Sequence, residues 1–212
     1  MKPSRLVTIL VTLAIVIATA PISDQFGQVR ELTSQDTDKS LDIERYSNEP
    51  LELVDLKVGE QVLKYKITSK FMNGDAGLDT VNFKERNGWF KRILITMRNV
   101  SGRSIYGLSA YLYFAPPGSR TLYSLPLVAS TILKQGVAEP GAEITLTVSD
   151  QAWSLTSGIF DKHGVDPDGA SVQFSLGLVH FANDLQWSKG HLLRRDPNNP
   201  YTWKVIDMKV GP

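Results

Sequence analysis

Residues suited to ligand binding gather near the C-terminus. Within seventeen positions the sequence places two tryptophans, a tyrosine, a histidine and two adjacent arginines. Aromatic rings beside guanidinium groups suit sugars and anionic polymers, because they supply stacking faces next to planar donors. The candidate ligand-binding residues are Trp187, His191, Arg194, Arg195 and Tyr201. A purely structural role is the alternative, in which Arg195 pairs with Asp196 and Trp203 fixes the last strand onto the domain.

No catalytic motif accompanies this cluster. The G-x-S-x-G, H-E-x-x-H, G-x-x-x-x-G-K-S/T and G-x-G-x-x-G patterns are missing, and the 212 residues include no cysteine. Residues 166–169 resemble the start of a calcium loop, but the later ligands are missing, which favours a simple turn. We therefore expect no enzyme, no cofactor and no metal site. A carboxylate-dependent hydrolase stays open, since any two of the 22 acidic residues could meet in space.

The first eighteen residues have the layout of a secretory signal peptide. Lys2 and Arg5 precede the apolar run from Leu6 to Ala18, and small residues follow it. The run is shorter than the roughly 20 apolar residues of a spanning helix. We expect cleavage after Ala18, export to the periplasm or the outside of the cell, and no membrane association afterwards.

Polar composition and missing periodicity predict a tether over residues 19–49, with a short helix at 41–46 as an alternative. Residues 50–207 have the size of one domain, and 208–212 form a tail. The 23 basic and 22 acidic residues give a formal charge of +1, without the basic excess of a nucleic-acid surface.

A two-residue period of apolar side chains predicts strands throughout the domain. In the clearest example, Phe174 and Leu176 share one face and Ser175 lies on the other. Turn residues between 93–100 and 105–114 predict that these two segments pair as a hairpin. The predicted strands are 51–58, 62–70, 91–100, 104–114, 121–128, 142–148, 170–181 and 185–193, with a further one at 202–207.

One helix is predicted between the strands at 142–148 and 170–181. Ser149 or Asp150 can cap its start, and Gly164 is suited to its end. About eight short strands and one inserted helix predict an all-β fold, an antiparallel β-sandwich that is immunoglobulin-like in architecture.

Two spaced motifs carry a family resemblance. The first is the NVSGRSI stretch at 99–105; the second runs from WSKG at 187–190 through RRDPNNP at 194–200 to Trp203. They resemble the NVSGxxI hairpin and the W-x-x-G…RRDPxxP…W ending of an uncharacterised family of exported β-sandwich proteins in environmental bacteria. Ser104 replaces the usual proline of that hairpin, and Asn183-Asp184 replaces Asp-Gly. The resemblance implies a sandwich and export, and it implies no activity or catalytic residue.

Together these observations predict an exported, non-catalytic interaction module. Its expected partner is another envelope protein or a glycan, with no nucleic acid, and the sequence does not indicate its oligomeric state. The alternatives are a carbohydrate or cell-envelope polymer binding domain and the hydrolase. Coplanar exposed aromatic rings would favour glycan binding, and two carboxylates facing each other in a deep cleft would favour hydrolysis.

Overall fold

A computed structural model describes residues 36–66 and 76–206 of the chain. These residues belong to one unit, Ser34–Pro212. The predicted signal peptide, the first part of the predicted tether and the tail lie outside the described residues. Among the described residues, no helix has the length and apolar character needed to cross a membrane.

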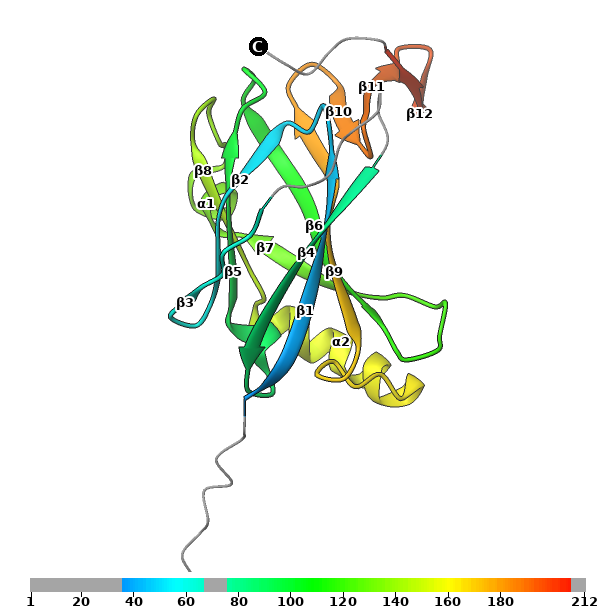
Figure 1. Ribbon diagram of the computed structural model, residues 1–212. Coiled ribbons are helices and arrows are strands. Elements are labelled where there is room, and N and C mark those ends of the chain that lie inside the picture. Colours follow the sequence, from blue (N-terminus) through cyan, green and yellow to red (C-terminus); the bar gives the residue numbers. More distant parts are fainter. Residues whose placement is uncertain (1–35, 67–75, 207–212) are drawn as a thin grey trace, which may run out of the picture. The chain divides into compact units, whose positions relative to one another are not determined.

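The described residues form twelve strands, two α-helices and one 3-10 helix (Figure 1). This architecture confirms the predicted all-β fold with a short inserted helix, with more strands than the eight expected. The strands are β1 (Thr37–Tyr46), β2 (Leu51–Val58), β3 (Gln61–Val62), β4 (Ala76–Glu85), β5 (Ile93–Asn99), β6 (Ile105–Ala115), β7 (Tyr123–Ala129), β8 (Glu143–Thr147), β9 (Ser171–Phe181), β10 (Leu185–Ser188), β11 (His191–Asp196) and β12 (Asn199–Val205). The helices are η1 (Trp89–Arg92), α1 (Ser130–Gln135) and α2 (Asp150–His163).

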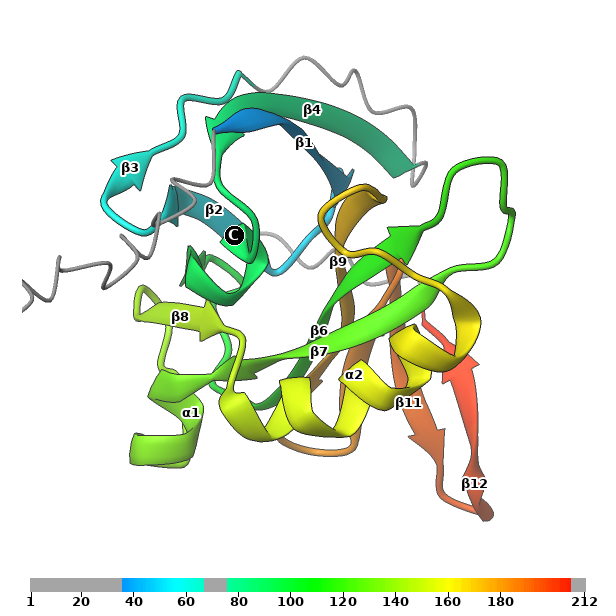
Figure 2. The same ribbon diagram turned by 90° about the horizontal axis from the view of Figure 1, so that it is seen from below.

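Strand β7 joins the two layers of the sandwich. The order β12-β11-β10-β9-β6-β7 continues through β8-β5-β2-β3. β7 pairs with β6 through residues 123–127 and with β8 through Val128 and Ala129, so it passes from one layer to the other. β1 pairs with β9 in the one parallel ladder of the described residues, which aligns residues 41–43 with 172–174. On its other edge β1 pairs antiparallel with β4. Figure 2 shows these strands arranged around the core.

Helix α2 begins and ends where the sequence predicts. The Ser149 hydroxyl accepts a hydrogen bond from the Ala152 N–H at 3.1 Å, and Gly164 ends the helix at a φ of 65°. A positive φ is strained for residues that carry a side chain, so a glycine suits position 164. The helix lies at the lower end of the strands in Figure 1. There Phe160 packs edge-on against Phe114 at 5.0 Å.

The predicted face of β9 is confirmed. Phe174 and Leu176 are 1% and 0% exposed. Ser175 lies on the opposite face but is also buried, and its hydroxyl donates a hydrogen bond to Glu44 of β1. Both faces of β9 are therefore covered at this point.

The prediction of a tether or short helix before residue 50 is wrong for residues 37–46, which form β1. Leu41 and Ile43 are buried in the core, whereas Asp42 on the other face accepts a hydrogen bond from Thr80 at 2.6 Å. Because the outer face of this strand carries charged side chains, the overall composition of the segment is polar and did not indicate a strand. The domain consequently begins before residue 50.

The predicted hairpin of 93–100 with 105–114 is also wrong. β5 pairs with β2 and β8, whereas β6 pairs with β7 and β9. The Asn99 side chain donates to the carbonyls of Arg103 and Ala138 and accepts from Ser101, which fixes a turn that leads from one layer to the other. The predicted strand 185–193 is two strands, since Lys189 and Gly190 form a turn with φ of 45° and 83°. The sequence reading also missed β4.

Candidate functional site

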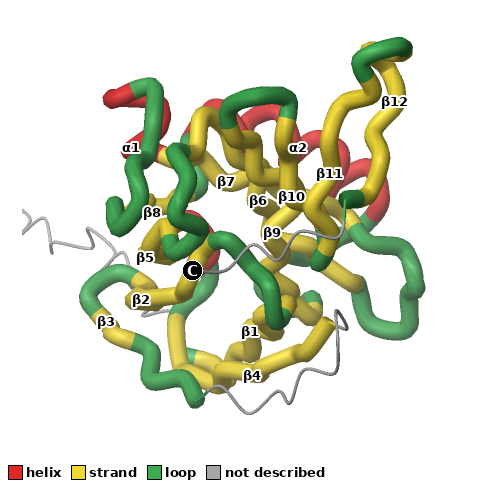
Figure 3. Tube along the Cα trace, turned by 90° about the horizontal axis from the view of Figure 1, so that it is seen from above, coloured by secondary structure: helices red, strands yellow, loops and turns green. Residues whose placement is uncertain are grey.

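Strands β11 and β12 form the terminal hairpin, which comprises residues 191–205. It extends the sheet beyond β10, and Figure 3 shows its turn projecting away from the neighbouring strands. Two turns with positive φ direct the chain into it, one at Asn183 and Asp184 and one at Lys189 and Gly190. Asparagine, aspartate and glycine tolerate this conformation, so the local sequence suits the turns.

Trp187 is not part of an exposed site, contrary to the sequence prediction. It is 0% exposed and packs edge-on against Tyr46 with ring centroids 5.5 Å apart. Its indole Nε1 lies 3.5 Å from Oδ1 of Asn48, whose amide nitrogen donates to the Gly190 carbonyl. Trp187 and Asn48 therefore connect β10 and its turn to the loop after β1.

The other four predicted residues, His191, Arg194, Arg195 and Tyr201, lie exposed on the terminal hairpin. Tyr201 is the most open of the large apolar side chains described, at 93% exposure. Arg195 does not pair with Asp196 as expected: its Nε lies 3.3 Å from Oδ1 of Asp184, and its guanidinium lies 5.1 Å from the centre of the Trp203 ring. Trp203 is half-buried rather than fully buried.

Asp196 instead stabilises the turn of the hairpin. Its carboxylate lies 2.6 Å from the Lys204 ammonium and accepts a hydrogen bond from the Asn198 N–H at 2.9 Å. The hydrogen bond from Lys204, followed by that from Asn198, lowers the pKa of Asp196. The Lys204 charge is therefore neutralised within its own hairpin.

A depression of about 450 Å³ lies where the hairpin meets the β9–β10 turn. Among the described residues, Arg194 is the charged group of this depression that has no hydrogen bond or ion pair. One unpaired guanidinium beside paired charges can bind an anionic side chain weakly. The depression is lined by Asn183, Asp184, Arg194, Arg195, Asp196, Pro197 and Pro200.

The outer edge of β12 is unpaired in the part of the chain that the structure describes, since β12 pairs there with β11 alone. The Ile206 N–H donates to the Leu192 carbonyl at 2.9 Å. Because backbone groups alternate between the two sides of an antiparallel strand, those of Trp203 and Val205 face away from β11. Tyr201 lies where the register of the ladder shifts, between the Asp196–Asn199 and Arg195–Trp203 pairs, and its N–H bonds to the Asn199 side chain. The hairpin thus presents a free edge.

A buried polar cluster at the end of β1 was missed by the sequence reading. Arg45 and Glu49 form an ion pair whose side chains are 10% and 2% exposed. Burial raises the pKa of Glu49 to about 7, although Arg45 acts in the opposite direction. Because Glu49 is enclosed by protein, it cannot contact a substrate. One signal was available, since Arg45 shares the parity of the apolar side chains before it.

The next carboxylate of β1, Glu44, is also fully engaged. One of its oxygens accepts from the Ser175 hydroxyl and the other from the Tyr46 hydroxyl at 3.1 Å. Burial, with Glu44 nearby, raises the pKa of Tyr46 to about 12, so this phenol stays protonated and continues to donate. Glu44 therefore has a structural role between β1 and β9.

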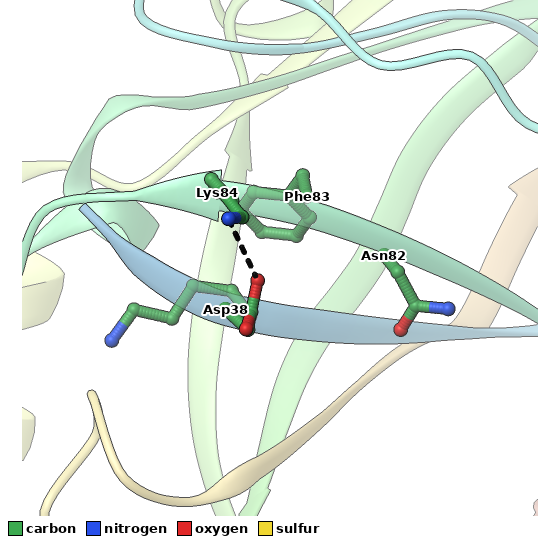
Figure 4. Close-up of a pocket in the computed structure, with 5 residues that line it drawn as sticks. Asp38, Asn82, Phe83 and Lys84 are labelled. Carbon is green, nitrogen blue, oxygen red and sulfur yellow. Dashed lines mark ion pairs between the residues drawn. The ribbon is translucent and has the colours of Figure 1, made fainter.

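Two further depressions flank the start of β1. The one in Figure 4 has about 380 Å³ and contains the ion pair of Lys84 with Asp38 at 3.9 Å. In the neighbouring one, of about 340 Å³, Lys39 donates to the Asp168 carbonyl at 2.9 Å. The Asp168 carboxylate accepts from the Gly88 N–H, so residues 166–169 form a turn that anchors the start of β9. The charges of these depressions are paired with one another.

Within residues 36–66 and 76–206, no three histidine, cysteine, aspartate or glutamate side chains lie close enough to hold a metal ion. Comparisons with protein-family models, curated proteins and solved structures find no match to this chain. The resemblance to the exported family therefore stays a hypothesis. Within the described residues, the outer edge of β12 has no partner strand.

Proposed function

We propose that this chain is an exported, non-catalytic β-sandwich module that binds another protein of the cell envelope through the free edge of β12. One observation carries the proposal: the outward backbone groups of Trp203 and Val205 lie beside the exposed side chains of Tyr201 and Val205. An extended peptide that adds a strand to such an edge gains main-chain hydrogen bonds and apolar contacts together.

A protein partner agrees better with the geometry than a glycan does. Stacking on sugar rings needs exposed aromatic faces, but Trp187 is fully buried and Arg195 lies over the Trp203 ring. Among the tryptophan and tyrosine rings of the predicted cluster, Tyr201 alone is exposed. A hydrolase is also less well supported, because Glu44 and Glu49 are engaged in structural contacts.

Export rests on the signal-peptide layout of residues 1–18. A chain without cysteine needs no disulfide formation outside the cytoplasm, and its large apolar core provides stability there. The proposed partner accordingly belongs to the periplasm or the cell exterior.

Site-specific photo-crosslinking in cells tests the contact surface. A photoreactive amino acid replaces Tyr201 in one variant and Leu133 of α1 in the other, a control residue that is 75% exposed. We expect protein adducts at position 201 that are missing at position 133. Equal adduct patterns at the two positions, or no adduct at 201, would overturn the proposal.

A further inference from the structure

The free edge of β12 also indicates what kind of segment it binds, given that it binds a protein as proposed above. We infer that the partner segment is an extended strand in which a glutamate, flanked by apolar residues, pairs with Lys204 and Arg194. The regular ladder of β11 with β12 covers residues 203–205, because its register shifts between Arg195 and Asp196. So short an edge forms few main-chain hydrogen bonds, and selectivity must come from side chains.

An added antiparallel strand would meet this edge in a definite register. The outward backbone groups of Trp203 and Val205 would form hydrogen-bonded pairs with the added strand. The partner residue between those two pairs would lie opposite Lys204, at a non-hydrogen-bonded position where Cα atoms are about 4.5 Å apart. Like charges directly opposite each other are destabilising and opposite charges are favourable, so a carboxylate suits this position.

Arg194 provides a second cation on the same face. It is the β11 residue paired with Lys204, so both side chains project from one face of the sheet. The Lys204 ammonium already lies 2.6 Å from Asp196, whereas Arg194 has no hydrogen bond or ion pair among the described residues. Arg194 also lines the depression of about 450 Å³, which leaves room for a partner side chain beside its guanidinium.

The distance across β12 favours glutamate over aspartate. The added strand would lie two strand spacings, about 10 Å, from β11. The side chains of Arg194 and of the partner residue would have to close this gap from opposite sides of β12. Glutamate is the longer of the two acidic side chains, and its carboxylate can accept two parallel hydrogen bonds from a guanidinium.

The opposite face of the hairpin selects the neighbours of this glutamate. Trp203 and Val205 project from that face, where Val205 is 58% exposed and Trp203 is half-buried. The partner residues before and after the glutamate would lie opposite these two side chains. Cross-strand pairs of aromatic and β-branched side chains are stabilising, so the expected motif is apolar-glutamate-apolar.

The distribution of charge along the chain favours the same partner. Residues 183–206 contain four basic and two acidic side chains, whereas residues 36–66 and 76–182 contain fourteen basic and sixteen acidic ones. The two acidic residues of the first segment, Asp184 and Asp196, are paired with basic residues of that segment. An acidic partner is therefore attracted to the hairpin more than to the rest of the described surface.

Binding of defined peptides tests the inference. The probe is the capped peptide Thr-Val-Glu-Val-Thr, and its neutral match has glutamine in place of glutamate. We expect the glutamate peptide to shift the amide resonances of Trp203 and Val205 in the purified chain, and to bind about fivefold more tightly than the glutamine peptide. Arg194→Gln should remove most of this preference. Equal affinities for the two peptides, or no shift of these resonances at millimolar glutamate peptide, would overturn the inference.

Two controls make the peptide result specific. Arg120→Gln removes the same charge from an exposed residue outside the hairpin, and it should retain the preference for glutamate. Polygalacturonate carries carboxylates but has no peptide backbone that can add a strand to β12. Tighter binding of polygalacturonate than of the glutamate peptide, or an equal loss of preference in both arginine variants, would count against an acidic strand as the partner. Thermal melts check that each variant is folded.

Photo-crosslinking at position 201 in cells separates this inference from the proposed function. We expect the protein adducts to be weaker in Arg194→Gln and unchanged in Arg120→Gln. Adducts that persist unchanged in Arg194→Gln would overturn the acidic partner and leave the proposed function standing. The absence of adducts in the wild-type background as well would overturn both.

Discussion

The indole Nε1 of Trp187 lies 3.5 Å from the side-chain oxygen of Asn48, and this contact ties β10 to the loop after β1. The Asn48 amide nitrogen donates at the same time to the Gly190 carbonyl in the β10–β11 turn. One side chain thus holds the base of the terminal hairpin against the sandwich. The contacts of Asn48 therefore stabilise the part of the sandwich from which the terminal hairpin and its free edge extend.

Asn48→Ala should lower the free energy of unfolding by about 1–3 kcal/mol, because it leaves the Trp187 N–H and the Gly190 carbonyl unpaired. Asn198→Ala is the matched control, since its side chain is exposed and only its backbone N–H contacts Asp196. Urea denaturation of both variants measures the difference. Equal midpoints for the two would show that Asn48 is not a clasp.

Trp187 and Tyr201 should respond oppositely to truncation. Trp187→Ala creates a cavity in the core and should cost about 3–5 kcal/mol of stability. Tyr201→Ala removes a 93% exposed ring and should change stability by less than about 0.5 kcal/mol. Thermal and chemical denaturation measure the stability of both variants. A larger loss of stability for Tyr201→Ala than for Trp187→Ala would contradict the burial of Trp187.

Stability should fall as the pH rises toward neutrality, because of Glu49. Its pKa is raised from 4.5 to about 7 by burial, so the folded chain binds the proton more tightly than the unfolded chain. The resulting stabilisation is fully present below pH 4.5 and is lost as the pH rises through 7, by up to about 3 kcal/mol. Urea denaturation from pH 4.5 to 8 measures this slope.

Glu49→Gln should flatten that pH dependence, since glutamine does not titrate. Glu60→Gln is the control, because Glu60 is exposed and should retain the wild-type slope. A wild-type slope in Glu49→Gln would assign the pH dependence to other groups.

Replacing Asp196 should destabilise the protein more than replacing Arg195. The pair of Arg195 with Asp184 is exposed, with side chains 45% and 65% accessible, so Arg195→Ala should cost less than about 1 kcal/mol. Asp196→Ala removes the acceptor of the Asn198 N–H and of Lys204 in the turn and should lower the urea midpoint more than Arg195→Ala does. The reverse order in urea midpoints would count against the contacts described for the turn.

Local patterns in the sequence were sufficient for part of the fold. The faces of β9 follow from the alternation around Phe174, and the limits of α2 follow from Ser149 and Gly164, because capping and parity depend on neighbouring residues. The 99–105 turn was recognised, but turn residues do not say which strands pair. Pairing depends on contacts between distant segments, so the β5–β6 hairpin prediction failed.

The candidate site was predicted in part for the same reason. His191, Arg194, Arg195 and Tyr201 lie on an exposed hairpin, as their polar and aromatic character suggested. Trp187 is buried and packs against Tyr46, the last residue of β1, a strand that charged residues such as Glu44 hid from the sequence analysis. The partner of Arg195 comes from the β9–β10 turn, a contact that sequence adjacency to Asp196 does not reveal.

Amide hydrogen exchange at the edge of β12 tests the central claim most directly. The N–H groups of Trp203 and Val205 face outward, whereas that of Ile206 is bonded to Leu192. In the purified chain Trp203 and Val205 should exchange rapidly while Ile206 is protected. If Trp203 and Val205 are protected as strongly as Ile206, β12 is not a free edge that can bind a partner strand.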